Sequence, residues 1–572
     1  MKAMAAAAAV TADAPTGPTR GADWLPYVVA VLSGLVLLVF IVYPIGKTTL
    51  NAFIMQDDAL WFSNLTFGNF ANFLISPTYQ DAFIHSIEIA GWTTLLSALL
   101  GIPMAYAVSR VRIPLRGVII TLSVIPLIAP PFIGAYAWII LLGHNGMLSH
   151  VINLIPGVTW PGIYGPTGIV FVLALHYFPY IFLFVQGALT AADPYIEESA
   201  QIMGASRPRI MRSVTFPLVM PAIMAGVIIT FAMGLGNFGV PAILGGEYYV
   251  LTTLMYYQVN AFFNLNAASA IALISVALTM IVVLIAQRFT RKRRFVTVTS
   301  TTRAAKRHTG LGARIAANIY IWLLLAVAIL PQAVVVFTSF AERWPGTILP
   351  QRMGIGNYVE VFTGIVDPIY NSMYLSAGAT ALCVIFGTLA AFASARKRFF
   401  GRSMLDLTIM LSFVLPGIVI GVAYLTAFNS GLLVLTGGSF IIIMAYFIHR
   451  LAYTFRSVLA SIGQLDPKME EASTICGAEW LYTMRKITVP LIAPGILAGG
   501  ILVFATLISD LNMTILLYSA DWKTIAVEIF DHLNNNEPML AATVGTFAIV
   551  FTVVLVFGAS KLVGKSMADM FR

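Results

Sequence analysis

Long apolar stretches make up most of this chain, and they constrain its fold more than any other feature. Of the 572 residues, 59% are hydrophobic and only 10% are charged, whereas about a quarter of the residues in soluble globular proteins are charged. A helix that spans a bilayer needs about 20 mostly apolar residues. Twelve runs of this kind begin near Leu25, Phe83, Gly117, Gly168, Pro217, Ala267, Ala316, Ser372, Ser403, Phe440, Pro490 and Leu540. We therefore predict an all-α polytopic membrane protein with about twelve transmembrane helices.

Lysines and arginines predict how these helices are oriented, because short cytoplasmic loops keep an excess of them. They gather in alternate loops, at 110–116, 207–212, 288–314 and 396–402. The opposite loops carry only Lys47, Arg343, Arg352 and Lys523. Both termini and the basic loops are thus predicted to be cytoplasmic. The net charge of +9 is explained by this topology, and we expect no nucleic-acid partner.

The chain also contains an internal repeat. Gly204 and Pro217 lie 273 positions before Gly477 and Pro490, and each pair follows an acidic turn. Nearer the start of each copy, Arg110 lies 286 positions before Arg396. Each copy holds six predicted spans, so the copies insert in the same direction as parallel repeats. The predicted organisation is a disordered cytoplasmic tail (1–23), a first repeat (24–287), a basic cytoplasmic linker (288–314) and a second repeat (315–572).

The repeated turn carries a family resemblance. In each copy a Glu-Glu pair and small residues lead to the glycine, and an apolar-Pro step follows a basic stretch. This resembles the EAA loop of permease subunits of binding-protein-dependent ABC importers, and both copies keep its Gly-to-Pro spacing. The resemblance implies a fused two-repeat permease of the bacterial inner membrane, with two cytoplasmic ATPase subunits and a periplasmic substrate-binding protein as partners. The ATPase-docking residues that it implies are Glu197, Glu198, Ala200, Gly204, Glu470, Glu471, Ala472 and Gly477.

Helix chemistry supports a structured loop in each copy. Asp193-Pro194 and Asp466-Pro467 supply a predicted N-cap and a helix-opening proline. Gly204 and Gly477 allow a sharp bend into a second short basic helix. The alternative reading is an ordinary amphipathic helix at the membrane interface.

We expect no enzyme activity and no cofactor in this chain. The segment 46–49 (Gly-Lys-Thr-Thr) is similar to the end of a phosphate-binding loop, but Ile41 stands where that motif needs a glycine. ATP and Mg are therefore expected on the partner subunits. The cysteines, Cys383 and Cys476, are not spaced for a disulfide or a metal site.

Polar residues deep in apolar runs are costly and indicate a translocation path. Asn237 and Asp510 are the clearest, and they lie 273 positions apart at equivalent places in the two repeats. Asn512 and Glu88 complete the candidate path. The alternatives are a structural hydrogen bond between helices for the central residues and a snorkelling side chain for Glu88.

Prolines inside predicted spans bend helices. Pro130, Pro131 and Pro416 are therefore candidate gate residues, although such bends also shape packing. Two histidine-aromatic groups are predicted at opposite ends of the fourth and tenth spans, as packing residues and not as metal ligands. They are His176 with Tyr177 and Tyr180, and His449 with Arg450 and Tyr453.

The cargo is the least constrained part of the prediction. The fusion of two halves, with 237–239 (Asn-Phe-Gly) and 251–253 (Leu-Thr-Thr), looks most like the ferric-iron importer permeases, which implies ferric iron as cargo. Those permeases usually carry an acidic residue where this chain has Asn237, and 240–246 looks more like polyamine-type permeases. Polyamine, thiamine and aminoethylphosphonate stay open. An ion-coupled secondary transporter is a further alternative, but it gives no reason for the two EAA-like loops.

Overall fold

The computed structural model describes residues 25–56, 62–157, 159–291, 310–344, 348–396, 401–431 and 433–563. In the first half it contains α2 (Leu25–Leu37), η2 (Leu38–Val42), α3 (Tyr43–Ala52), η3 (Phe62–Asn64), α4 (Gly68–Ile75), α5 (Pro77–Arg110), α6 (Arg116–Ile128), α7 (Pro131–Leu142), α8 (Met147–Ile152), α9 (Pro166–Ala191), α10 (Pro194–Ile202), α11 (Arg207–Ile210), η4 (Met211–Thr215), α12 (Phe216–Leu235), α13 (Gly239–Leu244), α14 (Leu251–Asn260) and α15 (Leu265–Arg291).

The second half contains α16 (Leu311–Ser339), β1 (Ala341–Arg343), β2 (Arg352–Met353), α17 (Gly356–Gly364), α18 (Val366–Arg396), α19 (Arg402–Val414), α20 (Gly417–Phe428), α21 (Ser439–Ile462), α22 (Lys468–Ile475), α23 (Trp480–Thr483), η5 (Met484–Thr488), α24 (Val489–Leu507), α25 (Thr514–Leu517), η6 (Ala520–Trp522), α26 (Ile525–Asn534) and α27 (Pro538–Val563). The strands β1 and β2 form an antiparallel hairpin. The predicted tail, 1–23, and most of the predicted linker, 288–314, lie outside the described residues.

The predicted apolar runs all fall on helices. Among the described residues, ten helices are long and apolar enough to cross a membrane, and the bent pair α19 and α20 makes an eleventh span. The remaining run is α21, a helix of 24 residues that packs on both α18 and α24. The prediction of an all-α protein with about twelve membrane helices is therefore confirmed.

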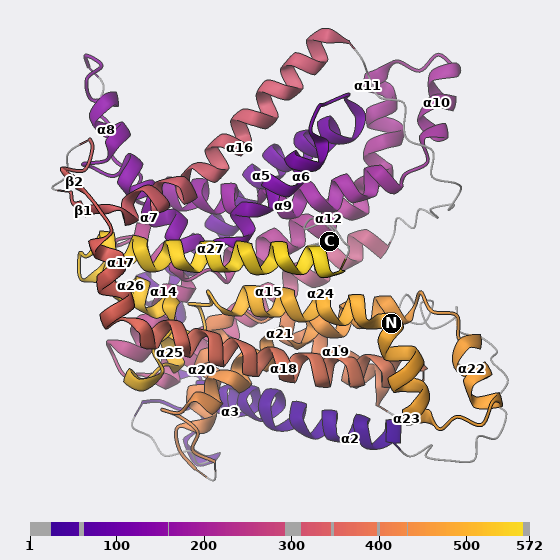
Figure 1. Ribbon diagram of the computed structural model, residues 1–572. Helices are drawn as coiled ribbons and strands as arrows, with labels where there is room; N and C mark the ends of the chain where they lie inside the picture. The colour runs from indigo at the N-terminus through magenta and orange to yellow at the C-terminus, as the bar shows by residue number, and fades with distance from the viewer. Residues whose placement is uncertain are drawn as a thin grey trace.

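The two halves repeat the same packing arrangement. In the first, α5, α9 and α12 pack on one another, and in the second α18, α21 and α24 do the same. Figure 1 shows these two groups one above the other, with the loops of α10 and α11 and of α22 and α23 at one end and α8 and the hairpin at the opposite end. The parallel arrangement of the repeats places both loops on the same side.

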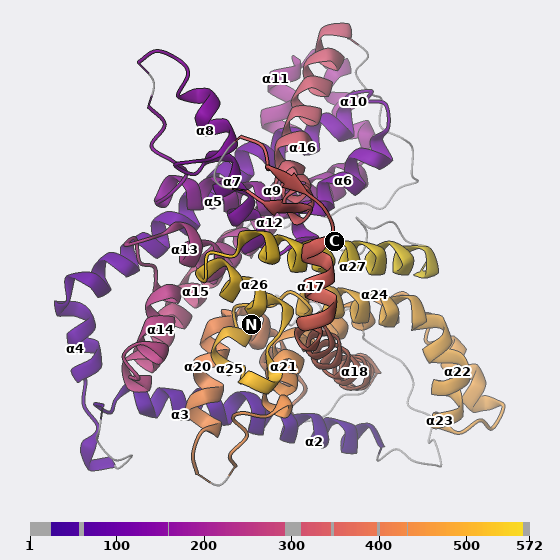
Figure 2. The ribbon, with the colours of Figure 1, turned by 60° about the vertical axis from the view of Figure 1, so that its left-hand side comes forward.

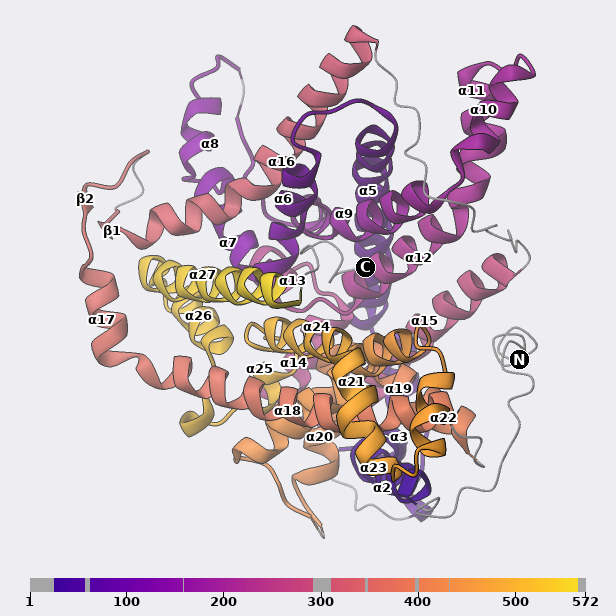
Figure 3. The ribbon, with the colours of Figure 1, turned by 45° about the vertical axis from the view of Figure 1, so that its right-hand side comes forward.

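The first helix of each half lies against the other half. Leu37 of α2 is buried in the core of the second half, and the Tyr424 hydroxyl donates to the Phe40 carbonyl at 2.9 Å. In the opposite direction, α16 packs on α5, α6 and α7, and Tyr320 donates to the Leu100 carbonyl at 2.7 Å. Figures 2 and 3 show α2 and α3 below the second half and α16 beside the first. The halves are therefore interlocked.

Lys47, from the segment that is similar to a phosphate-binding loop, also contacts the opposite half. Its ammonium group donates to the carbonyls of Ala427 and Ser430 at 3.2 Å each. These two hydrogen bonds link α3 to the second half.

Four of the apolar segments contain a break in the helix or end at one. Prolines cause two of the breaks, because proline lacks an N–H and forces the preceding residue into an extended conformation. Ala129 before Pro130 and Leu415 before Pro416 have ψ values of 141° and 132°, and α19 and α20 meet at 108°. The other two breaks follow α12 and α24, at Asn237 and Asp510.

Candidate docking loops and translocation path

The first EAA-like loop begins as predicted, with Asp193 at the N-cap of α10 and Pro194 as its first residue. In the second loop, by contrast, Pro467 itself occupies the N-cap of α22, and Asp466 precedes it. Asp193 Oδ1 accepts a hydrogen bond from the Tyr195 amide at 2.9 Å, and Asp466 Oδ1 accepts one from the Lys468 amide at 3.0 Å. These bonds satisfy amide groups that the first turn of a helix leaves without partners.

The predicted bend at the glycines is also confirmed. Gly204 and Gly477 both have φ of 83°, a left-handed conformation that only glycine adopts at little cost. After the bend, α11 and α23 lead through π-helical turns, η4 and η5, into α12 and α24. The two copies therefore share one backbone course from cap to span.

The tip of each loop is apolar and exposed. Ile202 and Ile475 occupy equivalent positions, and each is 86% exposed. Met203 beside Ile202 is 81% exposed. Exposed apolar clusters mark contact sites, and sequence reasoning singled out the acidic turn without this tip. The sequence signal that could have indicated this tip is an isoleucine two positions before each glycine, at the end of a mostly polar turn.

The predicted docking residues divide between two environments. Glu471 and Ala472 are exposed, Glu198 is half-buried and Ala200 is buried. Glu197 and Glu470 turn inward, and their carboxylates lie 3.0 Å and 3.1 Å from the guanidinium groups of Arg110 and Arg396. The two glutamates of each loop therefore face different surroundings, which their adjacent positions did not predict.

Asn237 and Asp510 make matching contacts in the two halves. Asn237 Oδ1 accepts from the Val240 amide and Asp510 Oδ1 from the Met513 amide, both at 3.0 Å. Each residue thus caps the backbone where its span breaks.

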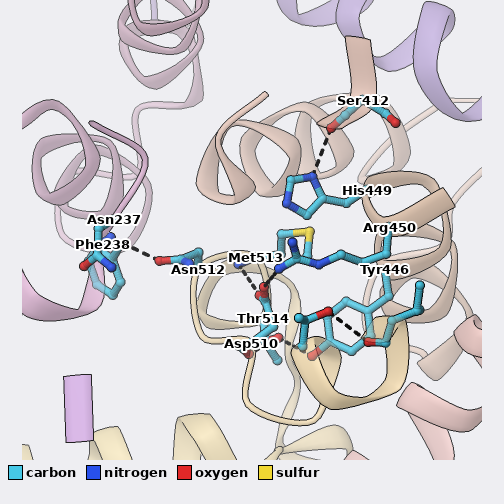
Figure 4. Close-up of polar contacts among 12 residues, drawn as sticks. Asn237, Phe238, Ser412, Tyr446, His449, Arg450, Asp510, Asn512, Met513 and Thr514 are labelled. Carbon is cyan, nitrogen blue, oxygen red and sulfur yellow. Dashed lines mark hydrogen bonds and ion pairs between the residues drawn. The ribbon is translucent and has the colours of Figure 1, made fainter. Parts of the chain in front are cut away.

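The remaining polar atoms of these two residues face equivalent side chains. Asn237 Nδ2 donates to the Tyr177 hydroxyl at 3.1 Å. In the second half, Arg450 Nη2 donates to Asp510 Oδ2 at 3.2 Å (Figure 4). Tyr177 and Arg450 also lie 273 positions apart. One position in the repeat therefore holds a neutral pair in the first half and an ion pair in the second.

The candidate path and gate residues meet where the two halves touch. Asn512 Oδ1 accepts from the Phe238 amide at 3.1 Å, which joins the break after α24 to the break after α12 (Figure 4). A Cβ atom added at Gly236 would lie 3.2 Å from Pro416 Cβ, so the proline of the α19–α20 break lies against the same region. We call Gly236, Asn237, Pro416, Asp510 and Asn512 the central junction.

The matching proline break of the first half approaches the central junction through Phe132. A Cβ atom at Gly239 would lie 2.8 Å from Phe132 Cβ, and Phe132 directly follows Pro130 and Pro131. All three predicted gate prolines therefore border breaks that reach the contact between the halves.

The prediction that the two histidine groups lie at opposite ends of their spans was wrong. His176 and His449 are 273 positions apart and occupy the same place in α9 and α21, because the repeats run in the same direction. His449 Nδ1 lies 3.1 Å from the Ser412 carbonyl, and His176 contacts the ring of Tyr177 edge-on. Among the described residues, no group of three or more His, Cys, Asp or Glu side chains could hold a metal ion.

Glu88 lies apart from the central junction. It is exposed in the N-terminal half of α5, where its Oε2 accepts from the Tyr248 hydroxyl at 3.0 Å. Burial raises the pKa of Tyr248, and the hydrogen bond to Glu88 raises it further.

An ionic cluster that sequence reasoning missed lies on α26. Lys523 Nζ is 2.7 Å from both Glu528 Oε2 and Asp531 Oδ2. His532 lies 3.0 Å from Glu528 through Nε2 and 2.7 Å from Glu537 through Nδ1. The hydrogen bond to Glu528 raises the pKa of His532 above its ordinary value, although burial opposes this.

Both repeats of this chain are similar in sequence to one known family. Residues 97–295 and 383–568 match the family described as binding-protein-dependent transport system inner membrane component. The chain is 27% identical over 559 residues to the ferric transport system permease protein FbpB of Actinobacillus pleuropneumoniae, which covers 94% of this chain and 79% of that protein. It is 25% identical over 241 residues to a Salmonella typhi protein named as a 2-aminoethylphosphonate transport system permease, PhnV, across 42% of this chain and 91% of that protein.

A solved structure of a bacterial alginate ABC transporter, in complex with a periplasmic protein, is also similar. One of its chains has 19% identity and a TM-score of 0.41, and the match covers 49% of this chain and 97% of that chain. The family match covers more than half of the sequence and falls in both repeats. This chain therefore belongs to the binding-protein-dependent transport system inner membrane component family, as a membrane-embedded ABC importer permease in which two repeats are fused.

Proposed function

We propose that this permease carries ferric iron, delivered by a periplasmic substrate-binding protein, into the cytoplasm. The observation that carries the proposal is the similarity to a ferric transport permease across 94% of this chain. That similarity runs through both repeats and therefore through both sides of the central junction. A match to one repeat alone could reflect only the shared architecture of the family.

ATP hydrolysis is assigned to two separate cytoplasmic ATPase subunits, which bind the ATP and Mg. Each subunit contacts one EAA-like loop, chiefly through the exposed tip at Ile202 or Ile475. The position of both tips at one end of the molecule supports this assignment (Figure 1). Arg110 and Arg396 contact the loops at this same end, which supports a cytoplasmic location for this end and for both chain termini.

Cargo crosses at the central junction. Broken helices release backbone polar groups that are tolerated at membrane depth only where they are buried in protein or line a cavity. Asn237, Asp510 and Asn512 border these breaks, and Pro130, Pro131 and Pro416 form the bends of the gate. Approach of the two loops on ATP binding displaces one half against the other and opens the junction to alternate sides.

Arg450 favours a second candidate cargo, a small phosphonate such as 2-aminoethylphosphonate. Its Nη2 pairs with Asp510, and its buried Nε has no hydrogen-bond partner among the described residues. A guanidinium group with a free donor suits an oxyanion, and one relative is named for this phosphonate.

Uptake of labelled cargo distinguishes the two candidates. Cells that lack the chromosomal gene are complemented with this permease, and accumulation of radioactive ferric iron or radioactive 2-aminoethylphosphonate is measured. We expect iron uptake to depend on the permease, with phosphonate uptake at the background of the empty vector. Permease-dependent phosphonate uptake without iron uptake would overturn the iron proposal.

A further inference from the structure

In each half, one glutamate of the EAA-like loop connects three helical segments. Glu197 on α10 faces Arg110, the last residue of α5, with 3.0 Å from Nε to Oε2 and 3.0 Å from Nη2 to Oε1. The Arg110 side chain is only 3% exposed. This two-pronged geometry fixes both direction and distance, as paired guanidinium and carboxylate groups do.

A threonine supplies the third contact. The Thr215 hydroxyl donates to Glu197 Oε1 at 3.0 Å. Thr215 is the last residue of the π-helical turn η4, directly before α12. Single π-helical turns within α-helices often mark functional positions.

The second half has the equivalent three residues, with a single close approach in place of the two-pronged pair. Arg396, the last residue of α18, lies 3.1 Å from Glu470 Oε2 through its Nε. Thr488, the last residue of η5, donates to Glu470 Oε1 at 3.3 Å. We call Arg110, Glu197 and Thr215 the first loop joint, and Arg396, Glu470 and Thr488 the second loop joint.

Each loop joint lies at the start of two routes into the membrane. One route is α12 or α24, which runs from the threonine to the central junction at Asn237 or Asp510. The other is α5 or α18, which runs from the arginine to the outer side. There Ser86 Oγ accepts from the Leu251 amide, and Ser372 Oγ accepts from the Ile525 amide, both at 2.8 Å.

We infer that the loop joints couple displacement of the EAA-like loops to the second and fifth spans of each half together. This inference rests on the proposed docking of ATPase subunits at the loop tips. Glu197 and Glu470 are then positioning residues for transport, while Ile202 and Ile475 form the docking contact. The inward-facing glutamate of each loop therefore transmits motion, and the exposed isoleucine binds the ATPase.

A purely structural role makes a different prediction. If the loop joints only stabilise the fold, weakening them lowers the amount of assembled permease without changing how the surviving complexes respond to ATP. If they transmit motion, complexes that retain the ATPase fail to move their outer side. Movement per assembled complex is therefore the quantity to measure, and it does not depend on the identity of the cargo.

The test uses the full complex of permease and ATPase in lipid nanodiscs, in a Cys383→Ala/Cys476→Ala background. Spin labels at Phe263→Cys and Asn535→Cys, both exposed, report the distance between the outer sides of the two halves. The distance is measured without nucleotide and with ATP and vanadate. The amount of ATPase that copurifies is measured in parallel.

For the double variant Glu197→Gln/Glu470→Gln, we expect the same amount of copurified ATPase as in wild type. The fraction of complexes that change their label-to-label distance on addition of ATP and vanadate should fall at least about tenfold, a factor within the range of coupling energies in proteins. Charge reversal in both halves (Arg110→Glu with Glu197→Arg, and Arg396→Glu with Glu470→Arg) should restore part of it. Outer movement equal to wild type in the double variant would overturn the inference. If charge reversal assembles but restores nothing, the ion pairs are not the coupling contact.

A matched variant separates failure of the inference from failure of the proposed docking. Ile202→Asp/Ile475→Asp changes only the exposed tips and should release the ATPase. If this variant keeps the ATPase while Glu197→Gln/Glu470→Gln releases it, the assigned roles are reversed and the inference is wrong.

If the double variant Glu197→Gln/Glu470→Gln assembles poorly, Glu197→Gln alone leaves the second loop joint intact and should give an intermediate movement. A wild-type response there would also refute the inference.

Discussion

At the residue scale, one equivalent pair of polar positions holds different residues in the two halves. Tyr177 with Asn237 is neutral, whereas Arg450 with Asp510 is an ion pair whose side chains are 12% and 2% exposed. A buried ion pair is stabilising only while both partners are present, because removing one leaves an uncompensated charge. The first half thus provides a natural template for a neutral second half.

We predict that Asp510→Asn alone destabilises the permease by about 3 kcal/mol, because Arg450 stays charged. The double variant Arg450→Tyr/Asp510→Asn copies the first-half pair and should recover most of this loss. Thermal unfolding of the purified protein in detergent measures both effects. Equal stability of the single and double variants would show that the ion pair is not the source of the loss.

The double variant also tests the path at Asp510. Because it keeps the fold, its transport rate per assembled complex reports on the charges themselves. We expect a decrease of about tenfold or more if cargo passes this pair. An unchanged rate would assign the pair to structure alone.

His532 gives a prediction for pH. Glu528 and Glu537 contact it, and Lys523 and Asp531 extend the cluster through Glu528. The hydrogen bond to Glu528 raises the pKa of His532 from 6.5. A raised folded-state pKa favours the protonated form, so the stabilisation is complete below pH 6.5 and is lost as the pH rises through the raised value.

We therefore expect α26 to open more readily as the pH rises from 6.5 through the raised pKa of His532. Hydrogen exchange of its amides, corrected for the intrinsic rate, measures this opening. In His532→Gln the pH dependence should disappear, with Asn535→Gln on the neighbouring exposed turn as control. A variant that keeps the full pH dependence would exclude His532 as its origin.

At the element scale, local residues determine the backbone of each EAA-like loop, and tertiary contacts determine the direction of its glutamate side chains. Asp193, Asp466 and the two glycines determine the capped helix and the bend from within the loop itself. The inward turn of Glu197 and Glu470 depends on arginines that end other helices, 87 and 74 positions earlier in the chain. The loop backbone was therefore predictable, and the division of its glutamates was not.

At the scale of the whole molecule, exchange of the first helices interlocks the halves. Leu37 lies in the core of the opposite half, so separation of the halves would expose apolar surface of both. We expect the permease to unfold as one unit, in a single cooperative transition.

The orientation in the membrane can be tested with the native cysteine of the second loop. Cys476 is exposed and Cys383 is buried, so an impermeant maleimide should not label intact spheroplasts and should label Cys476 after permeabilisation. Asn535→Cys in a Cys476→Ala background should react from outside without permeabilisation. Labelling of both positions from the same side would refute the proposed topology.

Hydropathy, spacing and repetition in the sequence determined the spans, the two repeats, the backbone of the loops and the equivalence of Asn237 with Asp510. These features depend on residues that are close along the chain or that recur at a fixed offset. The sequence also indicated the proline breaks, since proline acts on its own backbone and on the residue before it.

Only the tertiary structure decided the pairing of Asp510 with Arg450, the loop joints and the exchange of α2 and α16 between the halves. Each of these depends on which helices become neighbours, and an apolar helix carries little local information about that choice. The misplaced histidines have a different cause, because the offset of 273 positions between His176 and His449 already indicated equivalent places in the two repeats.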